Sequence, residues 1–143
     1  MTPIQIQLVR SSWAQVKPIQ DAAADLFYGR LFELAPETRA LFKRDIHVQG
    51  AMLMSMLDAV VAGLDRMPEL LPTARQLARR HVGYGVQPQH YDTVGTALMW
   101  TLEQGLGSAF TPHVRQAWLT AYSTLACAMK DAAADAVPVQ AAA

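Results

Sequence analysis

The chain has 143 residues, with 12 basic and 12 acidic side chains and a hydrophobic share of 52%. This length predicts one domain with a full core, and the balanced charge gives no sign of a nucleic-acid or anionic-membrane partner. The single cysteine, Cys127, excludes an internal disulfide framework and a cysteine-rich metal site. No run is apolar enough to span a membrane and we expect no signal peptide, so we predict a cytoplasmic protein, as a monomer or weak dimer.

The pattern of apolar residues predicts helices near residues 3–17, 20–34, 37–43, 48–65, 69–82, 89–106 and 112–134. Thr2 and Thr111 each offer a capping hydroxyl that is followed by proline in the first turn. No sustained alternation of apolar and polar residues indicates a strand. The sequence therefore predicts an all-α domain over residues 1–134. The alanine-rich tail, 135–143, contains Pro138 and is predicted to fray.

The clearest helical period lies in the stretch 48–65. One face of this predicted helix carries residues spaced by three and four, and we expect it to point inward: Gln49, Leu53, Met56, Leu57, Val60 and Leu64. Periodicity alone gives a helical domain that fits many unrelated functions.

Among four histidines, His81 has the most informative position. It ends a predicted helix just before Gly83 and Gly85, and Leu77 lies one turn earlier on the same face. A neutral imidazole in apolar surroundings suits iron ligation, and it equally suits a packed histidine with one hydrogen bond and no metal. Spacing alone favours the packed histidine.

The remaining candidates for chemistry have simpler interpretations. His90 and His113 are predicted to be loop or helix-start residues, and His47 is predicted to be exposed to solvent. No His-x-x-x-His, Glu-x-x-His or paired cysteine indicates a non-haem metal site. Cys127 lies among alanines in a predicted helix, which favours a core position over a nucleophile.

Several sequence strings resemble the globin family. The strings LFYGRLF (26–32), PE (36–37) and LF (41–42) resemble its second and third helices. The string MPELLP (67–72), followed by RRH (79–81), resembles the proximal region of flavohaemoglobins. The strings around 91–95 and LGSAFTP (106–112) resemble neuroglobin and related bacterial single-domain haemoglobins. These strings occur in the right order from about residue 8 to 129.

This resemblance implies a three-over-three globin fold around haem b. It implies that His81 is the proximal iron ligand, that Phe42 packs on the porphyrin, and that Gln49, 32 residues before His81, is the distal residue. Leu53 would face the ligand one turn further along, and Tyr28 matches the distal tyrosine of flavohaemoglobins. The other residues that it assigns to the haem pocket are Leu77, Val86, Tyr91 and Val94.

The implied distal residues suit a bound gas. The Tyr28 hydroxyl can donate a hydrogen bond, and the Gln49 amide can donate or accept one. Each good bond to a charge-bearing ligand contributes about 1.5–3 kcal/mol, which predicts tight oxygen binding and slow release. Each residue also has an ordinary structural interpretation: Tyr28 as a core tyrosine bonded to a backbone carbonyl, Phe42 as core, and Gln49 as a solvated helix-start residue.

The sequence departs from its relatives at two places. Gln49 stands where neuroglobins have the distal histidine, which disfavours a bis-histidine state, although His47 lies close by. On the proximal side, Tyr91 matches a tyrosine that flavohaemoglobins use, together with a glutamate, to hold the proximal histidine. Ala133 stands at the position of that glutamate, and Asp131 and Asp135 flank Ala133. One or more basic residues could pair with the haem propionates: Lys43, Arg44, Arg75, Arg79 and Arg80.

The function implied by the resemblance is reversible binding of oxygen, NO and CO for storage, transport or scavenging. A nitric oxide dioxygenase that works with a separate reductase is the enzyme alternative, since it would use the same distal residues. Gas sensing would need an output partner. A helical interaction module without haem remains a further alternative.

Overall fold

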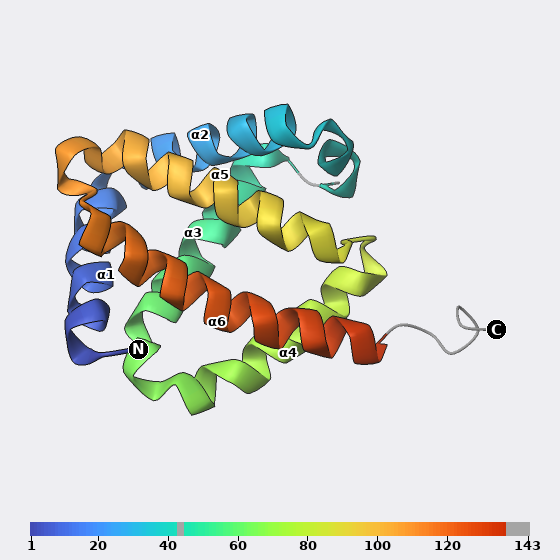
Figure 1. Cartoon of the computed structure of the whole chain (residues 1–143). Helices are drawn as coiled ribbons and strands as arrows, with labels where there is room; N and C mark the ends of the chain where they lie inside the picture. Colours follow the sequence, from blue (N-terminus) through green and yellow to red (C-terminus); the bar gives the residue numbers. More distant parts are fainter. Residues whose placement is uncertain (43–44, 137–143) are drawn as a thin grey trace.

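The computed structural model describes residues 1–42 and 45–136, with side chains described as far as residue 134. Within these residues the chain forms six α-helices and no strand, which confirms the predicted all-α class. The helices are α1 (Pro3–Val16), α2 (Gln20–Leu34), α3 (Ile46–Ala62), α4 (Met67–Gly83), α5 (Pro88–Leu106) and α6 (Pro112–Ala136) (Figure 1). The predicted frayed tail lies outside the described residues from position 137 onward.

The helix ends follow from local chemistry. The Thr2 side chain accepts a hydrogen bond from the backbone of Gln5, whose own side chain accepts one from Thr2, so α1 begins with a capping box. Two predicted elements differ from the structure. The stretch predicted as a helix over 37–43 is a 3-10 helix, Pro36–Leu41, and α3 ends at Ala62 and is followed by a separate 3-10 turn, Leu64–Arg66. Local periodicity does not distinguish these tighter turns from an α-helix.

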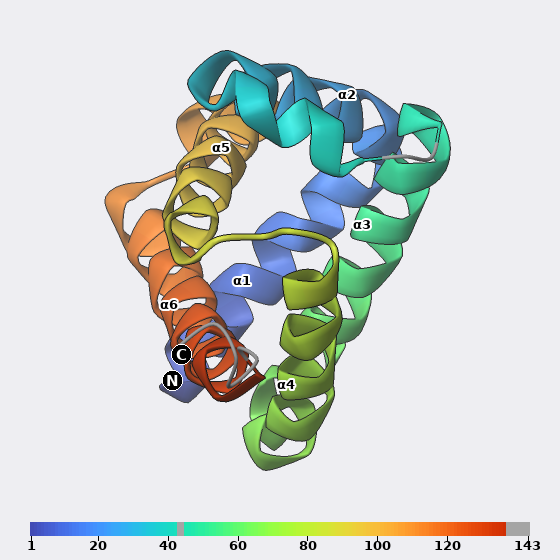
Figure 2. The ribbon, with the colours of Figure 1, turned by 90° about the vertical axis from the view of Figure 1, so that its right-hand side faces the viewer.

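The six helices form two layers. Helices α1, α3 and α4 lie in one layer, and α2, α5 and α6 lie in the other, with α4 packed on α6 and α2 packed on both α5 and α3. Figure 2 shows α5 and α6 on one side of the molecule and α3 and α4 on the other. Helices α3 and α4 make almost no direct contact with each other. The apolar residues of α3 and α4 are therefore not buried by contact between these two helices.

The core joins the N-terminal helix to the C-terminal one. Trp13 and Trp118 are both about 3% exposed, with ring centroids 6.1 Å apart. The Trp118 indole donates a hydrogen bond to the buried Ser12 hydroxyl at 2.8 Å, and the Trp13 indole donates to Asp58 of α3 at 2.9 Å. Each buried indole nitrogen thus has the partner that it requires.

The connections between helices are short and use glycine where the backbone turns. Gly85, in the turn after α4, has φ of +95°, and Gly107, after α5, has φ of +56°. Only glycine adopts these values without strain, so α4 and α5 end where the sequence places these residues.

No single described helix is long and apolar enough to cross a membrane. One bent pair of segments, Ile46–Ala62 and Leu64–Gly83, would together be long and apolar enough to span a membrane, judged by length and composition alone. The two segments meet at an angle of 63°.

Candidate functional site

The inward-pointing face predicted over 49–64 is only partly enclosed by the protein: Leu64 is buried in the core, and Leu53, Leu57 and Val60 pack against the core while remaining half-buried. The buried residues of α3 are Gly50, Met54 and Val61. On the predicted face, Gln49 is also half-buried, and Met56 is 39% exposed. This partial cover has a physical meaning, because an apolar helix face that the protein covers only in part is suited to a ligand or a partner.

Helix α4 shows the same feature on the side that carries His81. Its single buried residue is Ala78. Leu77, His81 and Val82 are half-buried, and so is Val86 in the turn that follows. The half-buried faces of α3 and α4 belong to the two helices that do not pack on each other. Both helices thus present half-buried apolar residues that the rest of the described protein encloses only in part.

His81 is held by the end of its helix. Its carbonyl accepts hydrogen bonds from the backbone of Tyr84 at 3.0 Å and of Val86 at 3.0 Å. Burial lowers the pKa of His81, and the backbone of Leu77, one turn earlier, opposes that shift. This approach to Leu77 falls short of a full hydrogen bond, because Nδ1 is buried without a partner. The ring is therefore neutral near pH 7, with a nitrogen lone pair available to a metal.

The close crossing of α2 and α3 positions Tyr28, the predicted distal tyrosine, beside Gln49. A Cβ on Gly50 would lie 2.9 Å from the Cβ of Ala24, so glycine permits this approach. The Tyr28 hydroxyl is 3.4 Å from the Gln49 carbonyl oxygen, which is long for such a bond. Burial raises the pKa of Tyr28 to about 12, opposed by a hydrogen bond from the Gln49 side chain. The hydroxyl remains a protonated donor at every physiological pH.

An aromatic cluster fixes the Tyr28 ring. Phe27 and Phe42 contact it edge-on, with centroid distances of 5.0 and 5.2 Å, and Phe32 lies 6.0 Å away. Phe42 itself is half-buried after the 3-10 helix, and Leu53 also packs against the core on one side. Phe42 and Tyr28, predicted from separate strings, are thus in direct contact.

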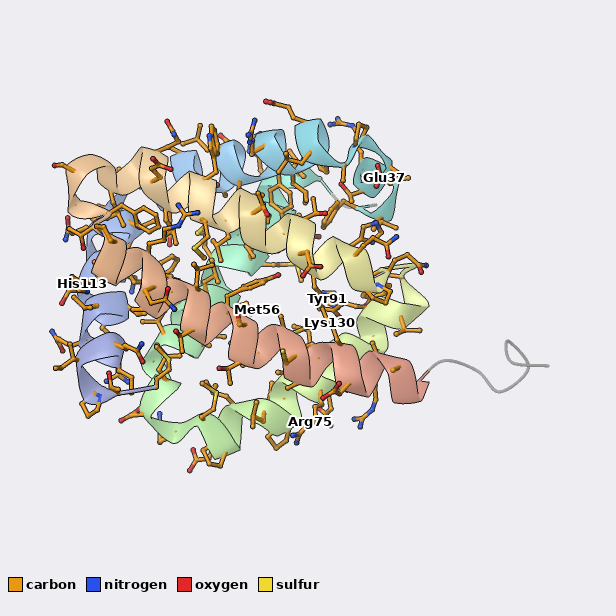
Figure 3. The ribbon with its side chains drawn as sticks, in the orientation of Figure 1. Glu37, Met56, Arg75, Tyr91, His113 and Lys130 are labelled. Carbon is orange, nitrogen blue, oxygen red and sulfur yellow. The ribbon has the colours of Figure 1, made fainter. Side chains whose placement is uncertain are left out.

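The predicted proximal residues of α5 also lie nearby. Tyr91 is 7% exposed, and burial raises the pKa of its hydroxyl, which is buried without a partner. Figure 3 shows Tyr91 on the side of α5 that faces α4. Val94, one turn further along α5, is half-buried. Ala133, at the position where flavohaemoglobins have a glutamate, is half-buried and offers no carboxylate.

The other predicted residues divide as follows. His47 has a 77% exposed side chain 3.6 Å from Asp25, so it is a solvent residue as predicted. Arg75, Arg79 and Arg80 are exposed on α4. Lys43 and Arg44 lie outside the described residues. Asp131 is exposed, and the side chain of Asp135 is not described.

The comparisons with known proteins identify this arrangement. The globin family model matches residues 25–129. The chain belongs to the globin family. The globin is 34% identical over 139 residues to neuroglobin from Chaenocephalus aceratus, covering 86% of each chain. It is 28% identical to a flavohemoprotein of Bacillus subtilis, covering 85% of this chain and 31% of that one.

A solved structure gives the same fold. This globin superimposes with a TM-score of 0.86 and 31% identity, over 99% of both chains, on an engineered carbene transferase from Rhodothermus marinus that is described as a nitric oxide dioxygenase. Family membership confirms the predicted globin fold and implies a haem cofactor that binds diatomic gases.

The residues of this globin fit a haem by their chemistry. The described residues hold no group of three or more His, Cys, Asp or Glu side chains that could bind a metal ion. A porphyrin brings four ring nitrogens of its own and needs one axial imidazole from the protein, which His81 offers. The half-buried apolar faces of α3 and α4 match the flat apolar ring. Two surface hollows among the described residues are lined by other side chains, one by Lys17 and Asp58 and the other by Trp100 and Lys130.

Sequence reasoning missed or misjudged three residues of this globin. Gly50, which sets the α2–α3 crossing, adjoins Gln49 inside an apolar helix, and that isolated glycine was the available signal. Cys127 is exposed, so its predicted core position is wrong, because alanine neighbours occur on both faces of α6. His90 starts α5 as predicted, but it is buried, and its Nδ1 accepts a hydrogen bond from the backbone of Gln87 at 2.9 Å.

Proposed function

We propose that this globin binds oxygen and other diatomic gases reversibly at a pentacoordinate haem b, with His81 as its one protein ligand. The observation that carries this proposal is the neutral, half-buried imidazole of His81, whose Nδ1 is buried without a partner. The half-buried apolar residues of α3 and α4 would then cover the haem. When bound, haem supplies a ferrous iron whose sixth position takes a diatomic gas. The protein supplies the ligand, the apolar cover and the hydrogen bonds.

On the proximal side, His81 would bind the iron through Nε2, because Nδ1 is the enclosed nitrogen. A small inward movement of the ring would let Nδ1 donate a full hydrogen bond to the Leu77 carbonyl, which fixes the tautomer. No carboxylate at Ala133 supports the imidazole. We therefore expect an ordinary neutral histidine ligand rather than one with imidazolate character.

On the distal side, Tyr28 and Gln49 would hold the gas. The Tyr28 hydroxyl donates only a weak bond at 3.4 Å to the Gln49 carbonyl, so it can turn to a better acceptor. Its pKa of about 12 keeps the proton in place. Leu53 would limit the space beside the gas, and Phe42 would cover the porphyrin face. Two donors in an apolar site favour oxygen over apolar competitors.

The haem assignment is tested by removing the imidazole of His81 and then supplying free imidazole in solution. We expect His81→Gly to lose the Soret band at physiological haemin concentration and to recover it when imidazole is added. His113→Gly, an exposed histidine at the start of α6, is the matched control and keeps its pigment. Retention of full pigment and gas uptake by His81→Gly would refute the proposal, as would a wild-type protein that stays colourless with haemin.

A nitric oxide dioxygenase is the second candidate, and it is favoured by the Rhodothermus marinus neighbour and by the flavohemoprotein relatives. In that activity oxygen and nitric oxide combine to give nitrate, and the iron returns to the ferrous state with one electron from an external reductase. Steady consumption of nitric oxide with a cellular reductase, at many turnovers per haem, would establish it. A single turnover that stops at the ferric protein would favour gas binding.

A further inference from the structure

The outer face of α4 carries an unusual concentration of unpaired positive charge. Arg75, Arg79 and Arg80 are all exposed, and within the described part of the chain none of them has an ion-pair partner. Figure 3 shows Arg75 at the outer edge of this helix. From residue 70 to 91 the sequence contains no aspartate or glutamate. The charge there is not neutralised by the helix itself.

Most of the other basic side chains that the structure describes have an ion-pair partner. Arg10 lies 2.9 Å from Asp65, and Lys17 lies 3.2 Å from Asp58. Lys130 lies 3.0 Å from an aspartate of α5. Because the whole chain has 12 residues of each sign, the arginines of α4 are a local segregation of charge rather than part of a basic protein. A local field of this kind attracts and orients an anionic partner.

An exposed aromatic residue extends this surface to His81. Tyr84, which caps the C-terminal end of α4, is 61% exposed, and its ring centroid lies 6.2 Å from that of His81. Arg80 lies four residues before Tyr84, so the two project from neighbouring positions on one helix face. Arginine and tyrosine are the residue types that most often anchor protein interfaces. A partner that contacts Tyr84 would therefore lie close to His81, the proposed iron ligand.

We propose that Arg75, Arg79, Arg80 and Tyr84 form the docking surface for an acidic electron-donor protein. This inference rests on the proposed function, because His81 must hold the iron. The exchange is one electron from the reduced iron–sulfur cluster or flavin of the partner to the ferric globin, which becomes ferrous; no bond forms or breaks. Acidic carboxylates on the partner would pair with the guanidinium groups, for which arginine geometry is well suited.

The test uses the full-length holoprotein with a plant-type [2Fe–2S] ferredoxin, an acidic protein, as the probe. Binding of the oxidised ferredoxin is measured by isothermal titration calorimetry at low and at physiological ionic strength. The rate of reduction by the reduced ferredoxin is measured by stopped flow. Reduction by dithiothreitol, which carries no charge at pH 7, reports on the ferric centre itself. The variant is the double charge reversal Arg75→Glu/Arg79→Glu, which spares Arg80 beside His81.

Arg115→Glu is the matched control, because Arg115 is exposed near the start of α6 and also lacks an ion pair among the described residues. We expect the double reversal to weaken ferredoxin binding, and to slow its electron transfer, by at least about tenfold at low salt. The control should stay within about twofold. The difference should shrink as salt screens the charges, and dithiothreitol reduction should be unchanged in the control. Equal slowing of ferredoxin and dithiothreitol reduction in the double reversal would show that these arginines act on the haem itself, and it would overturn the docking proposal.

Two further variants examine the aromatic contact. Tyr84→Ala should slow reduction by ferredoxin while leaving dithiothreitol reduction unchanged, and Tyr84→Phe should keep the wild-type rate. Equal behaviour of the double reversal and the control, or no salt-dependent association with ferredoxin, would overturn the proposal. So would charge-dependent binding to phosphatidylserine vesicles in place of ferredoxin. Failure of the haem assignment can be told apart from failure of the docking proposal. If the protein does not bind haem, it shows no Soret band before any partner is added.

Discussion

Replacing Tyr28 with phenylalanine separates its structural role from its proposed role toward the gas. The ring contacts with Phe27 and Phe42, at 5.0 and 5.2 Å, are kept in Tyr28→Phe, and only the hydroxyl is lost. That hydroxyl lies 3.4 Å from the Gln49 carbonyl, beyond the usual range for an O–H···O bond. We therefore expect the free energy of unfolding to fall by less than about 1 kcal/mol.

The effect on oxygen should be much larger. A donor bond to a charge-bearing ligand contributes about 1.5–3 kcal/mol, so its loss should speed oxygen dissociation about ten- to a hundredfold. The rate is measured by stopped-flow displacement of oxygen with CO, and stability by thermal unfolding. Because the pKa of Tyr28 is about 12, the donor stays protonated, and the wild-type rate should not change from about pH 6 to 10 through this group.

Tyr122→Phe is the control for loss of a buried tyrosine hydroxyl elsewhere. The Tyr122 hydroxyl donates to the backbone carbonyl of Tyr91, so this variant should lose stability and leave oxygen dissociation within about threefold. An unchanged dissociation rate in Tyr28→Phe would refute the distal role of that hydroxyl. A large loss of stability in Tyr28→Phe, with equal dissociation rates in both variants, would show that Tyr28 is a core tyrosine only.

Three other perturbations follow from the packing and the charges. Gly50→Ala places a Cβ 2.9 Å from that of Ala24, and we expect a loss of about 1–3 kcal/mol in unfolding free energy together with an altered oxygen dissociation rate; wild-type values for both would contradict the tight crossing. Ser12→Ala leaves the buried Trp118 indole without its acceptor, so we expect a loss of about 1–3 kcal/mol, or roughly 3–10 °C in Tm by calorimetry, and no change in gas binding. Hydrogen bonds from an indole and from a lysine lower the pKa of Asp58 below 3.8, so its contribution to stability is present above that pH and is lost as the pH falls through the lowered value. Acid unfolding curves should show Asp58→Asn losing that part of the pH dependence, and parallel curves would count against it.

Much of the fold could be predicted because its signals are local. Proline and capping residues mark helix starts, and Gly85 and Gly107 mark helix ends through backbone angles that other residues avoid. The type of the segment at 36–41 could not be predicted in the same way. A 3-10 helix and a short α-helix share nearly the same local pattern, and packing decides between them.

The candidate site is known from the sequence only as separate positions. His81, Gln49, Tyr28 and Phe42 can be named from their strings, and the resemblance supplies their roles as hypotheses. Periodicity assigned one apolar face of α3 to the interior, but it could not show whether protein or a ligand covers that face. An apolar side chain has the same sequence signal whether it packs on a helix or on a cofactor.

The sequence by itself determined the all-helical class, the places where helices start and stop, and the types of side chain available for chemistry. Tertiary structure alone decided that α3 and α4 stand apart, that Gly50 brings Tyr28 to Gln49, that Cys127 is exposed, and that three arginines of α4 have no partner among the described residues. The physical reason is distance along the chain. Helix boundaries depend on neighbours within one or two turns, whereas burial, pairing and uncovered faces depend on segments that meet only when the whole chain has folded.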